Sequence, residues 1–283
     1  MLQRTFLRPG DTDVAPRVPS ASQLPRLFLY ITSQIVVFLV MFQLYKVARK
    51  TFIARAERVA FDHAEDVLAF EAKLHLDFEL PLQKWILDQP HWVIAFFNHF
   101  YAYYMYVFYA CMVIAILFTV ERWRYFRRWF FISMAFATPW YVIYPLAPPR
   151  FMQDYGYSFV DTLKVWGPNY FSESGLVSTN RYAAMPSMHV GWTTLGAITL
   201  ASCLPWRRVG YCAAALLIAT ITITVIVTGN HYWLDAAAGW FVIAASALVN
   251  HLLPYPLSIN WPWVRARTPQ SAAPLATGSP HDG

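Results

Sequence analysis

The stretch "GNHYWLDAAAGW", residues 229–240, places a histidine and a carboxylate between two apolar runs. The apolar run before it is "AAALLIATITITVIVT" and the apolar run after it is "FVIAASALV". Such runs are typical of helices that span a bilayer, which need about 20 residues each. His231 and Asp235 are four positions apart, so they share one face if both lie on a helix. Asp235 would then lie about one turn inside an apolar segment, where a carboxylate requires a partner. We therefore expect a His–Asp pair near the end of a membrane helix.

The composition of the whole chain favours a membrane protein. Hydrophobic residues make up 57% of the 283 residues and charged residues 13%, whereas soluble domains carry about 25% charge. The net charge is +6, but the basic residues form no stripe along the sequence, so we expect no nucleic-acid partner. We expect membrane lipids around the chain instead. Cys111, Cys203 and Cys212 lie in or beside apolar runs, which argues against disulfides and a zinc site. No dinucleotide or phosphate-loop glycine motif is present, and we expect no cofactor and no required metal.

The apolar runs predict an all-α fold, a polytopic membrane helix bundle with six transmembrane helices and one amphipathic interfacial helix. We expect a disordered basic tail at 1–25, the first membrane helix and the interfacial helix at 26–90, a catalytic membrane bundle at 91–253, and a disordered tail at 254–283. The expected membrane helices are 27–45, 91–119, 127–147, 184–204, 209–228 and 233–252.

Residues 46–90 differ from the rest, because apolar positions recur at helical spacing with charges between them. The positions on this face are Ala56, Ala60, His63, Val67, Phe70 and Leu74. The pattern indicates an amphipathic helix that lies along the membrane surface or covers the bundle. An ordinary packed helix without any function explains the same pattern.

Basic loops indicate how the helices are oriented. "ERWRYFRR" (121–128) and "PWRR" (205–208) should be cytoplasmic by the positive-inside rule, and the loop 148–182 and the junction 229–232 then lie on the outer face. Five basic residues between 46 and 58 point the other way. We expect an integral multi-pass protein of the plasma membrane with its polar clusters on the outer face.

Two further polar clusters fall on the same face as the His–Asp pair, and "YPLAPPRF" (144–151) is the first. Its prolines stop a helix, because proline lacks an amide hydrogen and clashes with the preceding turn. Arg150 is thereby held at the interface. It is either a cation that grips a phosphate with a bidentate fork or a snorkelling anchor of the helix end.

"MPSMHVGW" (185–192) is the second cluster, and Pro186 suits the first position of a helix. The backbone amides near Ser187 and His189 would then point outward with the positive end of the helix dipole behind them, which suits an anion. A simple cap at Ser187 and a polar packing contact at His189 explain the same residues.

Two histidines, an arginine, a buried carboxylate and a helix N-terminus on one face together suit phosphoryl transfer. Asp235 would accept the Nδ1 proton of His231, fix its tautomer and leave the Nε2 lone pair facing outward. A structural His–Asp hydrogen bond is the alternative for that pair.

"PSMH", followed about 40 residues later by "HYWLD", resembles the type 2 phosphatidic acid phosphatase superfamily, and the likeness covers about residues 90–253. "PPR", "MPSMH" and "HYxxD" are similar to the branch that includes inositol phosphorylceramide synthases, an inositolphosphotransferase branch.

The resemblance implies a six-helix membrane bundle that acts on a lipid-linked phosphate without a metal. His231 would be the nucleophile that forms a phosphohistidine, and Asp235 its orienting partner. His189 would protonate the leaving oxygen and later activate the acceptor, while Ser187 and Arg150 bind the phosphate. His189 must then start protonated and His231 neutral, which predicts a bell-shaped pH profile.

Two cations of the superfamily pattern are missing from this chain. The pattern carries a lysine several residues before its arginine, but "TPWYVIYPLAPP" (138–149) has none. It also carries Ser-Arg before its last histidine, where this chain reads "TITVIVTGN" (222–230). Arg181 is the candidate substitute for binding the substrate phosphate, or a surface charge of the loop, and Lys164 is a weaker candidate.

Several functions remain open. A simple lipid phosphate or prenyl diphosphate phosphatase with water as acceptor would share the phosphohistidine, and a channel or transporter needs no catalysis. Scattered histidines argue against a membrane di-iron oxidase, and the few basic residues argue against a vanadate-dependent haloperoxidase. The aromatic run "FYAYYMYVFY" (100–109) fits bundle packing and interfacial anchoring, or a lipid-tail groove.

Overall fold

The computed structural model describes residues 24–53, 57–118, 120–168, 181–204 and 206–253. Within these ranges every regular element is a helix, apart from one isolated bridge between Leu146 and Ala183, so the all-α prediction is confirmed. All described residues belong to one compact unit, Met1–Leu253. The predicted tail 254–283 and nearly all of the predicted tail 1–25 lie outside the described residues.

The described residues form nine α-helices and one 3-10 helix. They are α1 (Leu24–Ile53), α2 (Glu57–Lys73), α3 (Glu79–Leu87), α4 (His91–Phe118), α5 (Val120–Ile143), η4 (Pro149–Tyr155), α6 (Thr162–Trp166), α7 (Met188–Cys203), α8 (Arg207–Val227) and α9 (Trp233–Leu252). The last two helices agree closely with the predicted spans 209–228 and 233–252.

Two of the described helices, α8 and α9, are long and apolar enough to cross a membrane. A shorter apolar stretch, Phe28–Leu44, lies within α1. These helices are consistent with a membrane protein. The count of six transmembrane helices stays a prediction.

Helix α8 shows how a threonine-rich run tolerates apolar surroundings. Each threonine hydroxyl donates to the carbonyl oxygen four residues earlier, at 2.8 Å from Thr220 and Thr222 and at 2.7 Å from Thr224. Thr228, just after the helix, does the same at 2.7 Å. The hydroxyls are therefore satisfied within the helix, as a segment without access to water requires.

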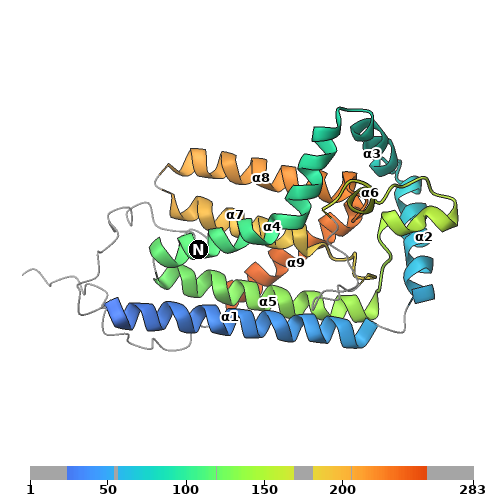
Figure 1. Ribbon diagram of the computed structural model, residues 1–283. Helices are drawn as coiled ribbons and strands as arrows, with labels where there is room; N and C mark the ends of the chain where they lie inside the picture. Colours follow the sequence, from blue (N-terminus) through green and yellow to red (C-terminus); the bar gives the residue numbers. More distant parts are fainter. Residues whose placement is uncertain (1–23, 54–56, 119, 169–180, 205, 254–283) are drawn as a thin grey trace, which may run out of the picture. The chain divides into compact units, whose positions relative to one another are not determined.

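The long helices α1, α4, α5, α7, α8 and α9 lie side by side, and α7 is central among them (Figure 1). It packs against α4, α5, α8 and α9. The short elements α2, α3, α6 and η4 gather at the end where α8 finishes and α9 begins (Figure 1). The polar junction between α8 and α9 therefore lies under a layer of short helices.

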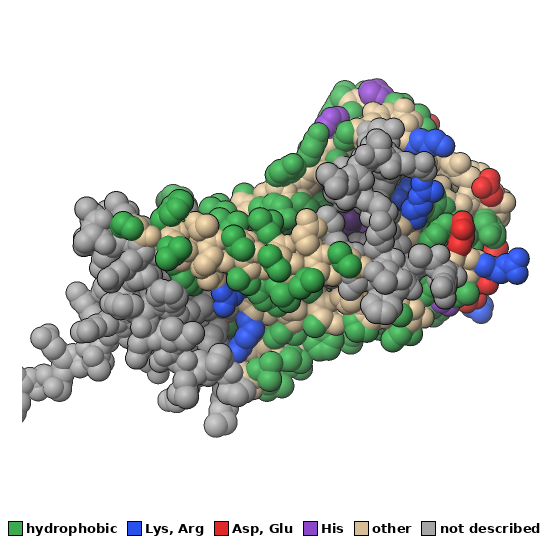
Figure 2. Space-filling model, turned by 60° about the horizontal axis from the view of Figure 1, so that its bottom comes forward, with side chains coloured by type: hydrophobic (Ala, Val, Ile, Leu, Met, Phe, Trp, Pro, Cys, Tyr) green, Lys and Arg blue, Asp and Glu red, His purple; other side chains and the backbone are tan. Residues whose placement is uncertain are grey.

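The outer sides of the long helices are apolar, and Figure 2 shows hydrophobic side chains along the bundle. Exposed examples are Phe28, Val36, Leu39 and Val40 on α1, Val209 and Leu216 on α8, and Phe241 and Leu248 on α9. Acidic side chains gather instead at the α2 end in this view. Such a division suits hydrocarbon around the long helices and water at the α2 end.

The predicted single amphipathic helix over 46–90 is wrong. Residues up to Ile53 belong to α1, and two shorter helices, α2 and α3, follow. Its predicted face is wrong in part, because Phe70 and Leu74 are exposed whereas Ala60 is fully buried. The small side chain of Ala60 lets the chain approach closely, and its carbonyl oxygen accepts the Ala147 N–H at 2.9 Å.

The predicted basic loop 121–128 is also wrong, since these residues lie within α5. Arg127 donates to the side chain of Gln34 on α1, and Arg128 donates to Asn250 on α9. Arginine has a good helix propensity, and these two arginines reach polar partners on neighbouring helices, so they need no loop to satisfy their charges.

Candidate active site

The junction between α8 and α9 carries His231 on non-helical chain. Gly229 adopts φ +70°, a left-handed conformation that suits glycine. A β-carbon at Gly229 would lie 3.0 Å from Val160 O and 3.3 Å from Arg150 Cβ. The expectation that His231 and Asp235 share a helical face is therefore wrong, because α9 starts at Trp233.

His231 and Asp235 meet through helix capping instead. Asp235 is the third residue of α9, and its Oδ2 accepts the N–H of the N-cap residue Tyr232 at 3.0 Å. The same oxygen lies 3.3 Å from His231 Nδ1. An acid three residues after the N-cap satisfies a free amide of the first turn, and here it also holds the imidazole.

His231 Nε2 faces His189 Nδ1 at 3.3 Å, so the two predicted histidines come together from positions 42 apart in the chain. His231 is 4% exposed, and His189 is half-buried. The ring centroids are 5.4 Å apart. This distance between the two nitrogens is that of a hydrogen bond and leaves no room for a further group between them.

Ser187 lies beside this pair as the N-cap residue of α7. The prediction of Pro186 at the first helical position is wrong, since α7 begins at Met188. Ser187 N–H donates to Asp235 O at 2.9 Å, which links the starts of α7 and α9. The Ser187 hydroxyl is fully buried and has no hydrogen-bond partner among the described residues, so it is available to a ligand oxygen.

Gly239 allows α9 to lie this close to Ser187. A β-carbon at Gly239 would come within 2.4 Å of the Ser187 carbonyl oxygen. Gly191 of α7 lies opposite, and a β-carbon there would be 3.4 Å from Gly239 O. Two glycines at the crossing thus bring the starts of the two helices together.

The segment before Arg150 pairs with the segment before Ser187. Leu146 N–H donates to Tyr182 O at 2.9 Å, and Ala184 N–H donates to Leu146 O at 3.2 Å. This bridge places the turn that carries Arg150 next to the start of α7.

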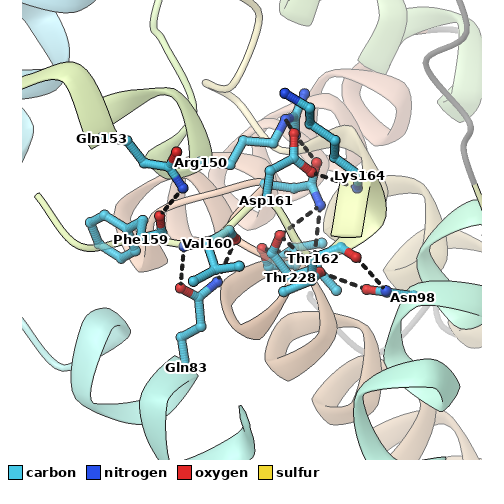
Figure 3. A network of polar contacts seen from close by, with 12 residues as sticks. Gln83, Asn98, Arg150, Gln153, Phe159, Val160, Asp161, Thr162, Lys164 and Thr228 are labelled. Atoms are coloured by element: carbon cyan, nitrogen blue, oxygen red, sulfur yellow. Dashed lines mark hydrogen bonds and ion pairs between the residues drawn. The ribbon is translucent and has the colours of Figure 1, made fainter. Parts of the chain in front are cut away.

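Arg150 lies on η4, which Pro148 and Pro149 introduce, and its side chain is buried. Its N–H donates to Gly229 O at 2.8 Å, and its guanidinium donates to the Asn230 side chain. Its Nε lies 3.5 Å from Asp161 Oδ2 (Figure 3). Burial lowers the pKa of the Arg150 guanidinium, whereas Asp161 raises it.

A network of amides fixes the loop that carries Asp161 (Figure 3). Gln83 of α3 donates to Val160 O and to Val227 O, both at 3.0 Å, and accepts the Val160 N–H at 2.8 Å. Asn98 of α4 donates to Thr162 O at 2.9 Å and accepts the Thr162 hydroxyl at 2.7 Å. Arg150 and its acidic partner are thereby held in a preorganised arrangement.

Arg181 and Lys164, the two candidate substitutes, are both exposed. Arg181 is near enough to lower the pKa of Arg150 by like charge. Lys164 lies on α6, and its backbone N–H donates to Asp161.

Two buried glutamates near the start of α9 were not anticipated from the sequence. Glu79 Oε1 accepts the Trp233 N–H at 3.1 Å, and Glu71 Oε1 lies 3.4 Å from Leu234 N as its acceptor. Both side chains are almost fully buried. Burial and the neighbouring Glu79 raise the pKa of Glu71 to about 10, and burial raises that of Glu79. In the sequence, the signal that could have indicated them was the presence of glutamates between the regularly spaced apolar residues of 46–90.

Asn230 and two tyrosines complete the set of unanticipated neighbours. Asn230 precedes His231 directly and contacts Arg150. Tyr101 and Tyr104, from the aromatic run on α4, contact the ring of His189. No cluster of three or more His, Cys, Asp or Glu side chains suited to a metal occurs in the described ranges.

The arrangement contains the parts that phosphoryl transfer requires: an oriented imidazole, a second imidazole opposite it, a buried hydroxyl and a fixed guanidinium. The model of the PAP2 superfamily, the type 2 phosphatidic acid phosphatases, matches residues 65–249 and thus spans the second half of α2 to nearly the end of α9. No curated protein and no solved structure shows significant similarity to the chain. The family match covers most of the chain and includes both histidines, and the chain therefore belongs to the PAP2 superfamily, whose members are phosphatase-type enzymes.

Proposed function

We propose that the protein is a membrane-embedded phosphotransferase that acts on a lipid-linked phosphate through a phosphohistidine. The observation that carries this proposal is the contact of His231 Nε2 with His189 Nδ1, with Asp235 on the other nitrogen of His231. A neutral His231 held by Asp235 presents its Nε2 lone pair, as a nucleophile requires.

In the first step His231 Nε2 attacks phosphorus and the bond from phosphorus to the leaving oxygen breaks. His189 gives its proton to that oxygen, and Asp235 stabilises the positive charge that develops on His231. Arg150 and the Ser187 hydroxyl bind the non-reacting phosphoryl oxygens.

In the second step an acceptor hydroxyl attacks the phosphohistidine. His189, now neutral, takes the proton of the hydroxyl, and the bond from phosphorus to His231 Nε2 breaks. His231 returns to its neutral form, so the cycle leaves the enzyme unchanged. Water or an alcohol can serve as acceptor in the same geometry.

The charge around the phosphate supports a phosphodiester donor, as in the inositol phosphorylceramide synthase-like branch. Arg150 is paired with Asp161, which reduces the net positive charge near the phosphate. The superfamily's additional lysine and arginine are missing from the sequence. A phosphodiester carries one negative charge and requires fewer cations than the dianion of a phosphomonoester. A phosphatase for lipid phosphates or prenyl diphosphates, with water as acceptor, is the alternative.

The test offers both kinds of substrate to the purified protein in lipid–detergent micelles. One reaction contains phosphatidylinositol and a lipid alcohol, and the other contains phosphatidic acid and water. We expect head-group transfer in the first to exceed phosphate release in the second, and both to disappear in His231→Ala. Phosphate release alone would favour the phosphatase, and no turnover in either reaction would leave the channel or transporter as the better function.

The proposed location is a multi-pass plasma-membrane protein with its active site on the outer face. In Figure 1 the starts of α5 and α8, which carry the basic residues of 121–128 and 205–208, lie at the end of the bundle away from the α8–α9 junction. By the positive-inside rule, these basic residues favour a cytoplasmic location for that end, and this supports an outer location for the histidines.

A further inference from the structure

The imidazole of His189 contacts two tyrosine rings of α4. Tyr101 stacks on it with centroids 4.3 Å apart and planes 18° apart. Tyr104 lies 4.1 Å away with the planes at 43°. The two tyrosines are three residues apart, so they extend from one face of α4. Tyr101 is buried and Tyr104 is half-buried.

The other groups around this corner set the electrostatic balance. They are His231 and Asp235 at the start of α9, Arg150 on η4, Tyr141 on α5, which donates to Pro186 O, and the apolar Ile221 and Val225 on α8. Arg150 disfavours a second positive charge at His189, whereas Asp235 favours one. The faces of the tyrosine rings also favour the protonated imidazole of His189, because the ring quadrupole attracts a cation.

The direction of these contacts also matters for the reaction. The Nδ1–H bond lies in the imidazole plane, and Nδ1 faces His231 Nε2 at 3.3 Å. In-line transfer places phosphorus and the leaving oxygen between these two nitrogens, so His189 has to withdraw along this line. A ring that slides in its own plane keeps its contact with a parallel aromatic face, whereas a ring that tilts loses it.

We propose that Tyr101 and Tyr104 are positioning residues for His189: their faces stabilise the protonated imidazole and guide it within its plane when a phosphoryl group enters. This inference rests on the proposed role of His189 as the proton donor. It also assigns a task to the aromatic run of α4, for which packing or a lipid-tail groove had been the open alternatives.

The kinetic test compares substitutions on two faces of the same helix. Tyr101→Leu and Tyr104→Leu remove the aromatic faces, Tyr101→Phe and Tyr104→Phe keep them, and Tyr103→Leu and Tyr106→Leu are controls at exposed positions. We expect kcat to be about 10-fold or more lower in Tyr101→Leu and in Tyr104→Leu than in wild type. A general acid contributes about 10²- to 10⁴-fold to the rate, and this loss would be a part of that contribution. KM should change little. The alkaline limb of the pH profile should move down by about 0.5 to 1.5 pH units, because His189 loses its proton more easily.

The second measurement needs no turnover. The ring nitrogens of His189 are titrated by NMR in the ¹⁵N-histidine-labelled full chain, with the signal assigned from His189→Asn. The leucine variants should titrate at lower pH than wild type, and the phenylalanine and control variants close to wild type. An unchanged titration in both leucine variants would overturn the inference, as would a loss of kcat in the phenylalanine variants equal to that of the leucine variants. If wild type is inactive, the proposed function fails, while the titration still tests whether the tyrosines stabilise the protonated ring. If the leucine variants do not fold, the phenylalanine variants still test the inference. They keep the aromatic faces, so a lower titration pH or a lower kcat in these variants would overturn it.

Discussion

Asp235 serves the helix and the histidine with one carboxylate oxygen. Its Oδ2 accepts the Tyr232 N–H at 3.0 Å and lies 3.3 Å from His231 Nδ1. The capping bond fixes the carboxylate, and the fixed carboxylate in turn fixes the imidazole. Its other oxygen, Oδ1, is buried without a partner among the described residues. A buried carboxylate with so few partners is costly, and this cost supports the proposed role of the pair beyond capping.

We predict that Asp235→Asn lowers kcat by about 10³- to 10⁴-fold. Asparagine can still accept the Tyr232 N–H, so α9 keeps its first turn. It cannot both hold the required tautomer of His231 and stabilise the imidazolium that forms on attack. The measurement is kcat for head-group transfer, with the melting temperature as the control for folding. A variant that folds normally and keeps more than a tenth of the activity would contradict this role.

Sequence reasoning predicted that His189, His231 and Asp235 lie together, because motif spacing and expected topology put them on one face, and the structure brings them into contact. It missed Glu71 and Asn230, whose contacts join residues far apart in sequence or depend on side-chain direction. Glu71 meets Leu234 across 163 positions. A single sequence shows such a carboxylate as one charge among others on an amphipathic helix. Only the packing of α2 on the start of α9 shows that it is buried.

At the crossing of α7 and α9, one missing side chain determines how closely two helix starts approach. We predict that Gly239→Ala destabilises the protein by about 1–3 kcal/mol, since its β-carbon would lie 2.4 Å from Ser187 O and backbone must shift. The shift separates Ser187 from the His–Asp pair, so kcat should fall as well. Melting temperature and kcat are measured together.

Gly191→Ala is the matched control at the same crossing. The nearest atoms to its β-carbon are side-chain carbons at 3.2 and 3.3 Å, which can move slightly. Alanine also favours a helix over glycine by about 1 kcal/mol. This variant should be close to wild type, and equal losses in both variants would argue against a specific approach at Gly239.

The layer made by α2 and α3 predicts an unusual pH dependence of stability. The pKa of Glu71 is raised to about 10 in the folded protein, by burial first and by Glu79 second, from an ordinary value of 4.5. The folded state therefore binds the proton more tightly than the unfolded state. The contribution of protonated Glu71 to the free energy of unfolding is fully present below pH 4.5. It is lost as the pH rises toward 10, by up to about 1.4 kcal/mol per pH unit.

Glu71→Gln should flatten that dependence, because glutamine is neutral and its oxygen still accepts the Leu234 N–H. We expect the melting temperature of wild type to fall from pH 6 to pH 9 more steeply than that of the variant. Glu65→Gln, at an exposed position of the same helix, is the control and should follow wild type. Parallel curves for Glu71→Gln and wild type would show that Glu71 is not protonated in the folded protein.

Helix positions could be predicted where the apolar pattern was long, as for α8 and α9. The pattern failed over 121–128, where arginines reach Gln34 and Asn250, because tertiary partners replaced the solvent that the loop prediction assumed. It failed again at Pro186, since the cap at Ser187 is fixed by a hydrogen bond from its N–H to Asp235 O on another helix. Both errors arise from contacts between elements, which local propensity does not contain.

The starts of α5 and α8, with their basic residues, lie at the end of the bundle away from the α8–α9 junction, which allows the orientation of the helices to be tested. In a cysteine-free background, Tyr155→Cys marks the η4 end and Trp206→Cys marks the start of α8, and both positions are exposed. We predict that a membrane-impermeant maleimide labels Tyr155→Cys in intact cells and Trp206→Cys only after permeabilisation. The reverse pattern would place the histidines on the cytoplasmic face.

The membrane character of the chain was evident from its composition, and the all-α fold and the superfamily followed from its patterns. The arrangement of α2 and α3 over the α8–α9 junction could not be predicted from the sequence. It depends on Glu71, Glu79 and Gln83, which form hydrogen bonds with backbone groups far away in sequence. These three side chains connect the layer of short helices to the ends of two long ones.

Trapping the phosphorylated enzyme tests the proposed chemistry most directly. Wild type is mixed with a ³²P-labelled lipid donor without an alcohol acceptor, quenched in alkali, and the labelled peptide is identified by mass spectrometry. We predict one labelled phosphorus on His231, which keeps the head group when the donor is a phosphodiester. The label should be absent in His231→Ala and slower to form in His189→Ala. Turnover with no labelled His231, or a His231→Ala variant as active as wild type, would contradict covalent catalysis at this histidine.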